Sequence, residues 1–288
     1  MKQIYKTISV LLAATLLLSF SGCAGLSEGV KYKNVGTGLA LFRYSGIPTV
    51  SELSIPAEKD GKPVVEIMEF ALASAEYLKT ITIGRNIKTI DKRAFTNCQS
   101  LERYVVETGN KYFETDKNGV LYTTGKKALV AYPSARVKTE KDSNGEIIKG
   151  AEFTVPASVT EICDVAFYLC GNLVKITFPE GLQKIGNYAF MKCENLTDFT
   201  LPDSLTEIGS DAFSYCDSLT VVTIPGKVKS IGDYAFFSLS SSISKIIVLR
   251  QESELQLGKD WIPKVKGQVN VPVSVEYGYT NPEYKSAD

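Results

Sequence analysis

The chain has 288 residues, of which 44% are apolar and 22% are charged, so it can bury a core and is not a disordered polypeptide. Lys plus Arg and Asp plus Glu number 32 each, which leaves no net basic charge for binding nucleic acid. Histidine is absent, which excludes Ser-His-Asp and Cys-His nucleophilic sites, histidine general bases and zinc sites that need imidazole.

The first predicted element is a secretory signal peptide over residues 1–22. Lys2 and Lys6 give it a positive start, and the apolar run Ile8–Leu18 is too short to span a bilayer permanently. The Phe-Ser-Gly-Cys sequence that ends at Cys23 resembles a bacterial lipobox, which implies lipid attachment at Cys23. The alternatives are an ordinary signal peptide with an incidental cysteine, or a short core helix. The protein is therefore expected to be secreted across the inner membrane and held by lipid in the cell envelope, at the outer membrane or cell surface.

Residues 24–63 are predicted to form an N-terminal cap. Short strand-like runs alternate there with glycine, and Asp60-Gly61 is a turn signal.

A 23-residue period then organises residues 64–249. In each repeat an apolar pair two residues apart precedes a proline, which predicts a short strand with one buried face. The glycine that often follows the recurring isoleucine indicates a tight bend, needed for a positive φ or for close approach. The A-F-x-x-C-x-x-L segment has helix-like apolar spacing and predicts a short helical turn. Six segments share this pattern and begin at Ile67, Ile90, Ile162, Ile185, Ile208 and Ile231.

This pattern closely resembles the BspA-type leucine-rich repeat, L-x-x-L-x-L-P-x-x-L-x-x-I-G-x-x-A-F-x-x-C-x-x-L. Residues 173–225 match it nearly letter for letter. The resemblance implies a mostly β leucine-rich-repeat solenoid with short helical turns, parallel strands on one face and a cap at both ends. It also implies adhesion-type binding of host or bacterial surface proteins. The sequence has no Walker A, dinucleotide-binding or G-x-S-x-G motif, so neither enzymatic activity nor a cofactor is predicted.

An insertion at about residues 108–149 interrupts the period. Residues 119–133 predict a hairpin around Thr124-Gly125-Lys126, similar to hairpins inserted as rungs in this family. The charged residues 137–149 predict a solvated loop, either a ligand-contacting excursion or a tolerated insertion. Asp116-Lys117-Asn118-Gly119 lacks the spacing of a calcium loop and indicates an Asn-Gly turn instead.

Residues 250–288 are predicted to form a C-terminal cap and tail. A charged stretch with Trp261 precedes the sequence QVNVPVSVEYGY, which resembles the closing strand of the family. The residues from about Thr280 are expected to be loose.

The recurring cysteines are predicted to be structural. Rungs about 4.8 Å apart allow a disulfide by Cα distance, but parallel side chains would have to tilt together. A zinc site needs converging ligands, which a linear ladder does not provide, so no metal site is predicted. We therefore expect free buried thiols, with disulfides as the alternative in an oxidising envelope. Cys163 stands outside the ladder, whose members are Cys98, Cys170, Cys193 and Cys216.

A second ladder consists of phenylalanines that each follow an alanine. Such a stripe could stack sugars or bases, but its strict period predicts a buried spine. Its members are Phe95, Phe167, Phe190, Phe213 and Phe236.

The outer face of the strands is the candidate binding strip. A run of threonines there is explained either by a recognition surface or by the preference of exposed strands for threonine. Six rungs would span about 25–30 Å, enough for an ordinary protein interface. The strip comprises Thr80, Thr82, Arg103, Val105, Lys175, Thr177, Asp198, Thr200, Val221 and Thr223.

These features favour a non-enzymatic envelope or surface lipoprotein that binds an unknown protein or glycan through its repeats. One alternative is a periplasmic structural or scaffold lipoprotein. Another is a carbohydrate-active enzyme that uses two carboxylates about 5–10 Å apart in a cleft. A regular repeat surface makes few clefts, which favours binding over catalysis.

Overall fold

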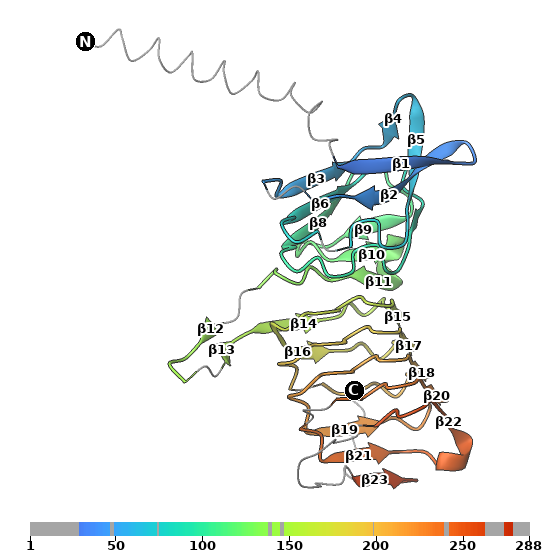
Figure 1. The fold of residues 1–288 in the computed structure, drawn as a ribbon. Coiled ribbons are helices and arrows are strands. Elements are labelled where there is room, and N and C mark those ends of the chain that lie inside the picture. Colours follow the sequence, from blue (N-terminus) through green and yellow to red (C-terminus); the bar gives the residue numbers. More distant parts are fainter. Residues whose placement is uncertain are drawn as a thin grey trace.

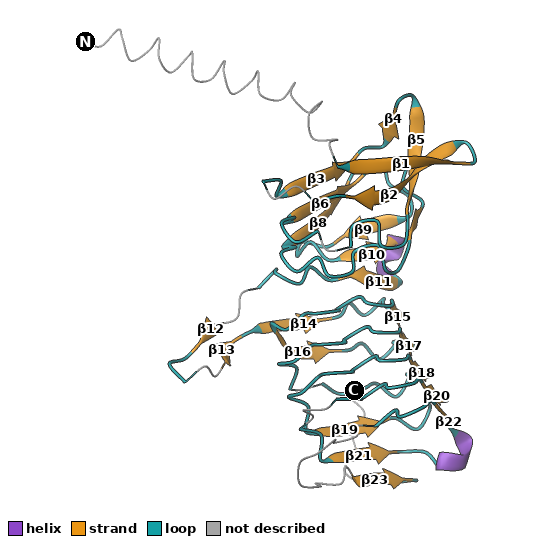
Figure 2. Cartoon of the chain, viewed as in Figure 1, coloured by secondary structure: helices purple, strands orange, loops and turns teal. Residues whose placement is uncertain are grey.

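The protein is described by a computed structural model over residues 29–46, 49–73, 75–137, 140–144, 147–197, 199–238, 242–262 and 274–278. Rungs of chain stack along one axis, from β1 (Val30–Val35) to β23 (Ser274–Tyr277) (Figure 1). Helix in the described ranges is limited to two 3-10 segments, η2 (Thr124–Lys126) and η3 (Glu252–Glu254) (Figure 2). The predicted mostly β solenoid is confirmed.

Most rungs begin with one strand of four or five residues. Alternate side chains of this strand are buried and apolar, and the others point outward, as one-sided burial of a strand requires. These strands are β3 (Glu52–Ile55), β6 (Thr80–Ile83), β8 (Arg103–Val106), β14 (Ala151–Thr154), β16 (Leu173–Thr177), β19 (Val221–Ile224) and β21 (Lys245–Val248), followed by β23. They pair in parallel in three sheets, ordered β3-β6-β8, β14-β16 and β19-β21-β23.

A second ladder of two-residue strands runs along another side of the solenoid. Ile162 pairs with Ile185, Ile185 with Ile208, and Ile208 with Ile231. Each residue of this ladder therefore pairs with the equivalent residue of the next repeat. The two-residue strands are β7 (Thr89–Ile90), β15 (Glu161–Ile162), β17 (Lys184–Ile185), β18 (Glu207–Ile208), β20 (Ser230–Ile231) and β22 (Gln256–Leu257).

The return segment of each rung consists of successive turns, not the predicted short helical turn. In one rung the Tyr168 N–H donates to the Val165 carbonyl over 3.1 Å, and the next such bond, from Cys170 to Phe167, also measures 3.1 Å. Between these bonds the Phe167 N–H donates to Ala189 of the next rung over 2.7 Å. Left-handed residues such as Val165 (φ 55°) and Leu169 (φ 61°) break the helical path. Their amide groups are thereby shared between local turns and the neighbouring rung.

The glycines after the recurring isoleucines serve close approach between rungs. Gly186 and Gly209 are not among the residues with positive φ. A Cβ atom on Gly209 would lie 2.6 Å from the Asn187 nitrogen and 2.6 Å from the carbonyl carbon of Gly186. Of the two roles predicted for these glycines, steric room is therefore the one that applies.

The N-terminal region begins with two antiparallel hairpins. β1 pairs with β2 (Gly38–Tyr44), and β4 (Glu58–Lys59) pairs with β5 (Lys62–Ile67). The second hairpin turns at Asp60 and Gly61, with φ values of 52° and 73°, as a two-residue hairpin turn requires. The turn predicted at this dipeptide is confirmed.

The insertion contributes three strands to the short-strand side, β9 (Phe113–Thr115), β10 (Leu121–Thr123) and β11 (Ala128–Ala131). β10 and β11 form the predicted antiparallel hairpin around η2, and β11 continues in parallel into β15. The Asp116 carboxylate accepts the Asn118 N–H over 2.9 Å and the Val120 N–H over 3.0 Å, which confirms the predicted turn.

The expected loop at 137–149 is wrong in one respect, because β12 (Glu140–Lys141) and β13 (Ile147–Lys149) pair as a small antiparallel hairpin. This hairpin projects from the side of the solenoid near β14 (Figure 1).

The described core consists of two apolar clusters that meet at the insertion. The N-terminal cluster includes Ile55, Ile81 and Tyr104, and the C-terminal cluster includes Phe190 and Phe213. On the long-strand side, β8 and β14 belong to different sheets. We call this boundary the joint, and we call residues 52–106 and 151–257 on its two sides the N-terminal and C-terminal arrays.

Candidate functional site

The predicted binding strip lies on the outer face of the long strands in two columns. Strand register places Thr80 beside Arg103 and Thr82 beside Val105 in the N-terminal array. In the C-terminal array the threonines are exposed at residues 177 and 200, half-buried at 223, and Val221 is 54% exposed. The strip residues named here point away from the core clusters.

The two columns continue beyond the residues that the sequence predicted. Glu152 pairs with Lys175, and Thr154 pairs with Thr177. This strand was not predicted, although Pro156 lies one repeat before Pro179 and marks its end. At the other end Lys245 and Ile247 pair with Val221 and Thr223. The same register adds Glu52, Ser54, Ser274 and Glu276.

The strip is divided at the joint. Three strands carry it in the N-terminal array. Six consecutive rungs, from β14 to β23, carry it in the C-terminal part, and at strand spacing these six rungs span about 24 Å. The rung at 197–201 contributes no assigned strand among its described residues, although the Thr197 N–H donates to the Val174 carbonyl over 3.1 Å. The longer continuous surface therefore belongs to the C-terminal part.

Charges on the strip are of mixed sign and lie mostly in the column that contains Arg103 and Lys175. Arg103 and Lys175 are exposed, and Lys245 forms an ion pair of 2.9 Å with Glu276 across β21 and β23. Small uncharged side chains occupy most of the adjacent column, which also holds Ile247 and Glu276. The strip therefore combines a column of mixed charge with a column of hydrogen-bonding threonines, which is not the chemistry of a polyanion site.

Two of the predicted residues lie outside the described residues. Cys23, the predicted lipid attachment site, belongs to the N-terminal range that the structure does not describe, and Asp198 of the strip is likewise outside it. In the described ranges, no helix combines the length and apolarity of a membrane span.

The predicted phenylalanine ladder forms a stack in the C-terminal array. The ring centroids of Phe167, Phe190, Phe213 and Phe236 are 4.7, 5.1 and 5.2 Å apart in succession, with interplanar angles of 14°, 4° and 3°. Tyr132 of the insertion extends the stack, with its ring 4.9 Å from that of Phe167. All five rings are buried, which leaves no face for a ligand.

Phe95 lies apart from this stack. Its ring is only partly buried and is tilted by 59° to Tyr104, with centroids 5.0 Å apart. The insertion separates Phe95 from Phe167, and Leu72 takes the place of a phenylalanine in the preceding repeat. No stacked ring partner is therefore available to it in the adjacent rungs.

The repeat cysteines lie buried and unpaired along the core. The Cys193 Sγ donates to the Phe167 carbonyl over 3.2 Å, and the Cys216 Sγ to the Phe190 carbonyl over 3.1 Å. Burial raises the pKa of Cys98 and of Cys163 to about 12. Free thiols are described at Cys98, Cys163, Cys170, Cys193 and Cys216. Within the described residues, no group of three or more acidic or cysteine side chains is arranged to hold a metal ion.

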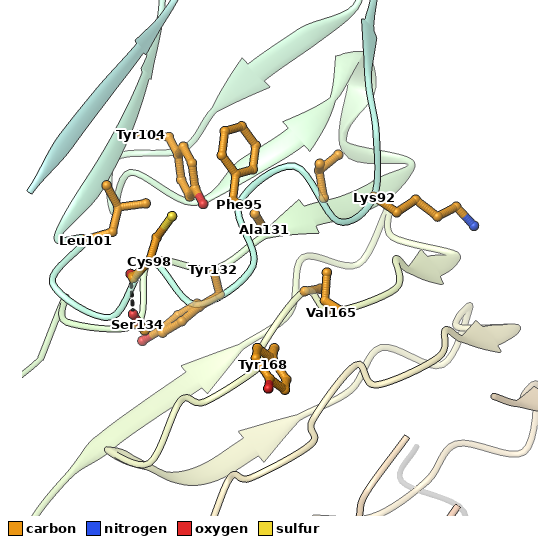
Figure 3. Close-up of a pocket in the computed structure, with 12 residues that line it drawn as sticks. Lys92, Phe95, Cys98, Leu101, Tyr104, Ala131, Tyr132, Ser134, Val165 and Tyr168 are labelled. Carbon is orange, nitrogen blue, oxygen red and sulfur yellow. Dashed lines mark hydrogen bonds between the residues drawn. The ribbon is translucent and has the colours of Figure 1, made fainter. Parts of the chain in front are cut away.

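A small cavity lies at the joint (Figure 3). It is lined from the N-terminal side by Cys98 and Tyr104 and from the other side by Tyr132 and Val165. Its volume is about 20 Å³, which accommodates roughly one water molecule. Small-molecule sites are commonly about 300 Å³ or larger, so this cavity is a packing defect and not a substrate site.

The parallel rungs, the 23-residue register and the buried Leu, Ile and Phe positions define a leucine-rich-repeat solenoid. The family model described as "BspA type Leucine rich repeat region" matches residues 19–117 and 147–257 in six copies. The chain therefore belongs to the BspA-type leucine-rich repeat family.

One solved structure supports the same fold. The pneumococcal vaccine antigen PcpA is similar with a TM-score of 0.59 and 23% identity, over 76% of this chain and 57% of that chain. This chain thus spans little more than half the length of PcpA. A leucine-rich cell surface protein from Faecalibacterium prausnitzii has a TM-score of 0.45 and 17% identity, over 80% of this chain and 93% of that one. A leucine-rich repeat protein of T. pallidum has a TM-score of 0.41 and 24% identity, over 81% and 84% of the two chains. Among curated proteins, none matches.

Proposed function

We propose that the protein is a non-enzymatic, lipid-anchored envelope or surface protein that recognises another protein through the outer strand face. Residues 1–22 would act as the signal peptide and Cys23 as the lipid attachment site. The regions 24–63 and 250–288 would close the two ends of the solenoid. Membership of a family with bacterial surface relatives supports this proposal.

The observation that carries the proposal is the continuous outer column of the C-terminal part. Thr154, Thr177, Thr200 and Thr223 occupy equivalent outward positions in four consecutive rungs. A six-rung surface of about 24 Å is comparable with one side of a standard protein interface of about 800 Å². Its small side chains require little ordering when a partner binds.

A binding screen against matrix proteins, cell-surface proteins and glycans tests this recognition. For a ligand that binds, Thr177→Arg and Thr200→Arg are expected to weaken affinity at least tenfold, because a long charged side chain would stand in the interface. Gln183→Arg is the matched control, since Gln183 is exposed beside the short-strand ladder. No saturable binding by folded protein would count against recognition. Equal effects of all three variants would place the ligand elsewhere.

Anchoring and exposure need a separate experiment. Labelling with a radioactive fatty acid is expected in the wild type and absent in Cys23→Ser. Protease treatment of intact cells should then remove the protein from the surface. Label in Cys23→Ser would disprove acylation at that cysteine. A labelled but protease-protected protein would instead indicate a periplasmic scaffold.

A further inference from the structure

Two exposed phenylalanines, Phe42 and Phe70, belong to adjacent chain segments near the end of the solenoid that β1 and β2 form, opposite β23 (Figure 1). Their side chains are 37% and 48% exposed. The Leu41 carbonyl accepts a backbone N–H of the second segment over 2.9 Å, and the Ala71 carbonyl accepts one of the first segment over 2.7 Å. The two rings therefore belong to one area of the surface, which we call the end patch. The end patch comprises Lys31, Phe42, Arg43 and Phe70.

A β-bulge places Phe42 outside the core. Lys31 pairs with Arg43, but the next residue of β1, Tyr32, pairs with Leu41, so Phe42 is the extra residue of β2. A bulge changes the direction of the side chains beside it, and Phe42 and Arg43 are consecutive residues that are both exposed. Regular alternation along the strand would bury one of them. The bulge thus presents an aromatic ring and a cation together.

The charges of the end patch are positive. Lys31 and Arg43 are exposed and directly opposite each other on β1 and β2, although like charges in this position destabilise a strand pair. Within the described ranges, no carboxylate forms an ion pair with either. Arg93 lies 5.1 Å from the centroid of the Phe70 ring, and its charge is paired with Glu69. The two unpaired cations therefore favour an anionic surface outside the protein.

The end patch lies close to the predicted lipid attachment site along the chain. Gly29 is the first described residue, and its carbonyl accepts the Ser45 N–H over 2.7 Å, two residues beyond Arg43. Gly29 follows Cys23 by six positions, a length of chain that reaches at most about 20–22 Å. A lipid on Cys23 would hold the end patch within this distance of a bilayer.

We propose that the end patch contacts the membrane, with Phe42 and Phe70 at the level of the headgroups and Lys31 and Arg43 against anionic phospholipid. The proposal rests on the lipid attachment at Cys23 that is part of the proposed function. Aromatic side chains are enriched at membrane interfaces, and a basic residue near an anionic leaflet strengthens binding about fivefold. The anchor supplies a high local concentration of bilayer, so a contact too weak to act alone becomes effective. The contact would set the orientation of the solenoid on the membrane.

Protein comprising residues 23–288, coupled through Cys23 to a maleimide lipid in vesicles, is the test system. Trp261 is the single tryptophan, so Phe42→Trp in a Trp261→Phe background gives a unique fluorescent reporter. Its emission is expected to be quenched by brominated phospholipid in vesicles that contain phosphatidylglycerol, and less so as salt is added. Tyr188→Trp in the same background is the matched control, because Tyr188 is also 37% exposed but belongs to the C-terminal array. It should not be quenched. No quenching of the Phe42→Trp reporter, or equal quenching of both, would overturn the proposal.

Variants of the two cations test the charge. With the reporter in place, Lys31→Gln and Arg43→Gln are each expected to weaken the contact about fivefold. Both side chains are exposed, so neither variant should lower the melting temperature. Lys227→Gln removes an exposed cation from the C-terminal array and should leave the quenching unchanged. If Lys227→Gln weakens the contact as much, the attraction depends on overall charge and the proposal fails.

The membrane contact and the proposed anchoring can fail separately. Chemical coupling supplies the anchor in this experiment, so an unquenched reporter counts against the end patch even where cells acylate Cys23. Absence of fatty-acid label in the wild type would instead count against the natural anchor, whatever the coupled protein shows. An unquenched protein that forms dimers lost in Phe42→Ser would assign the end patch to a second copy of the chain and overturn the membrane contact.

Discussion

The two arrays share a period but differ in how their cores pack. In the C-terminal array four phenylalanine rings stack with interplanar angles of 14° or less, whereas Phe95 in the N-terminal array tilts by 59° against Tyr104. Both arrays keep the parallel register of the two-residue strands. The period therefore sets the backbone register, while a continuous stack also needs an aromatic residue in every consecutive rung.

The largest expected effect separates the two arrays directly. Phe190→Ala should lower the free energy of unfolding by about 3–5 kcal/mol, because a fully buried ring with a stacked neighbour on each side leaves a cavity. Phe95→Ala should cost only about 1–2 kcal/mol, since that ring is partly exposed. Urea denaturation of both variants measures the difference. Equal losses would show that stacking adds nothing to the C-terminal array.

A second experiment tests the close contact between rungs. Gly209→Ala should destabilise the protein by about 1–3 kcal/mol, because its Cβ would lie 2.6 Å from the Asn187 nitrogen. Gly171→Ala is the matched control, since nothing lies within 4 Å of the added atom. It should change stability by less than about 0.5 kcal/mol. Thermal unfolding of the pair measures both, and a neutral Gly209→Ala would contradict the close-approach role.

The buried thiols predict a loss of stability at alkaline pH. Burial raises the pKa of Cys98 and Cys163 from 9.0 to about 12, so between these values the folded protein keeps protons that the unfolded chain releases. Stability from these groups is complete below pH 9 and falls as pH rises towards 12. The loss should be about 1 kcal/mol per thiol between pH 9 and 10. Urea midpoints across this range test it, and Cys163→Ala should flatten the slope.

Thiol counting addresses the same cysteines by chemistry. Native protein is expected to react slowly with a thiol reagent at neutral pH because the thiols are buried and protonated. After denaturation without reductant, protein comprising residues 24–288 should show five reactive thiols, from Cys98, Cys163, Cys170, Cys193 and Cys216. Fewer than five would indicate disulfides and disprove the reduced ladder.

The smallest expected effect concerns the left-handed turn residues. Lys192 has φ 61° in the C-terminal array, and the corresponding N-terminal residue, Asn97, has φ 63°. Lys192→Asn should stabilise the protein by up to about 1 kcal/mol, because asparagine tolerates this conformation. The reverse exchange, Asn97→Lys, should destabilise it by a similar amount. Differential scanning calorimetry measures both shifts, and shifts of the same sign would contradict this explanation.

The sequence predicted the features that repeat and failed where interactions are specific to one place. Strand positions, the buried phenylalanine and leucine columns and the outward threonines follow from the period, because parallel register carries each residue onto its equivalent. The turn conformation did not follow, since Val165 and Leu169 are poor left-handed residues whose φ is imposed by bonds to the next rung. Local preference alone favoured a helix there.

The candidate site was predicted only where the repeat is regular. Thr177 and Thr200 were found from their period, whereas Thr154 was missed because it directly follows the insertion. The joint and its cavity depend on how Tyr132 and Tyr104 from different clusters meet, which no periodic pattern specifies.

The register of Ile162, Ile185, Ile208 and Ile231 has a consequence for the length of the molecule. Removing residues 185–207 would bring β15 against β18 with the same isoleucine pairing and the same ring-on-ring contact. Each such deletion or duplication would shift the two ends by about 4.8 Å without creating a new type of contact. The C-terminal array can thus be shortened or extended by whole repeats, so its reach can vary while its surface chemistry is preserved rung by rung.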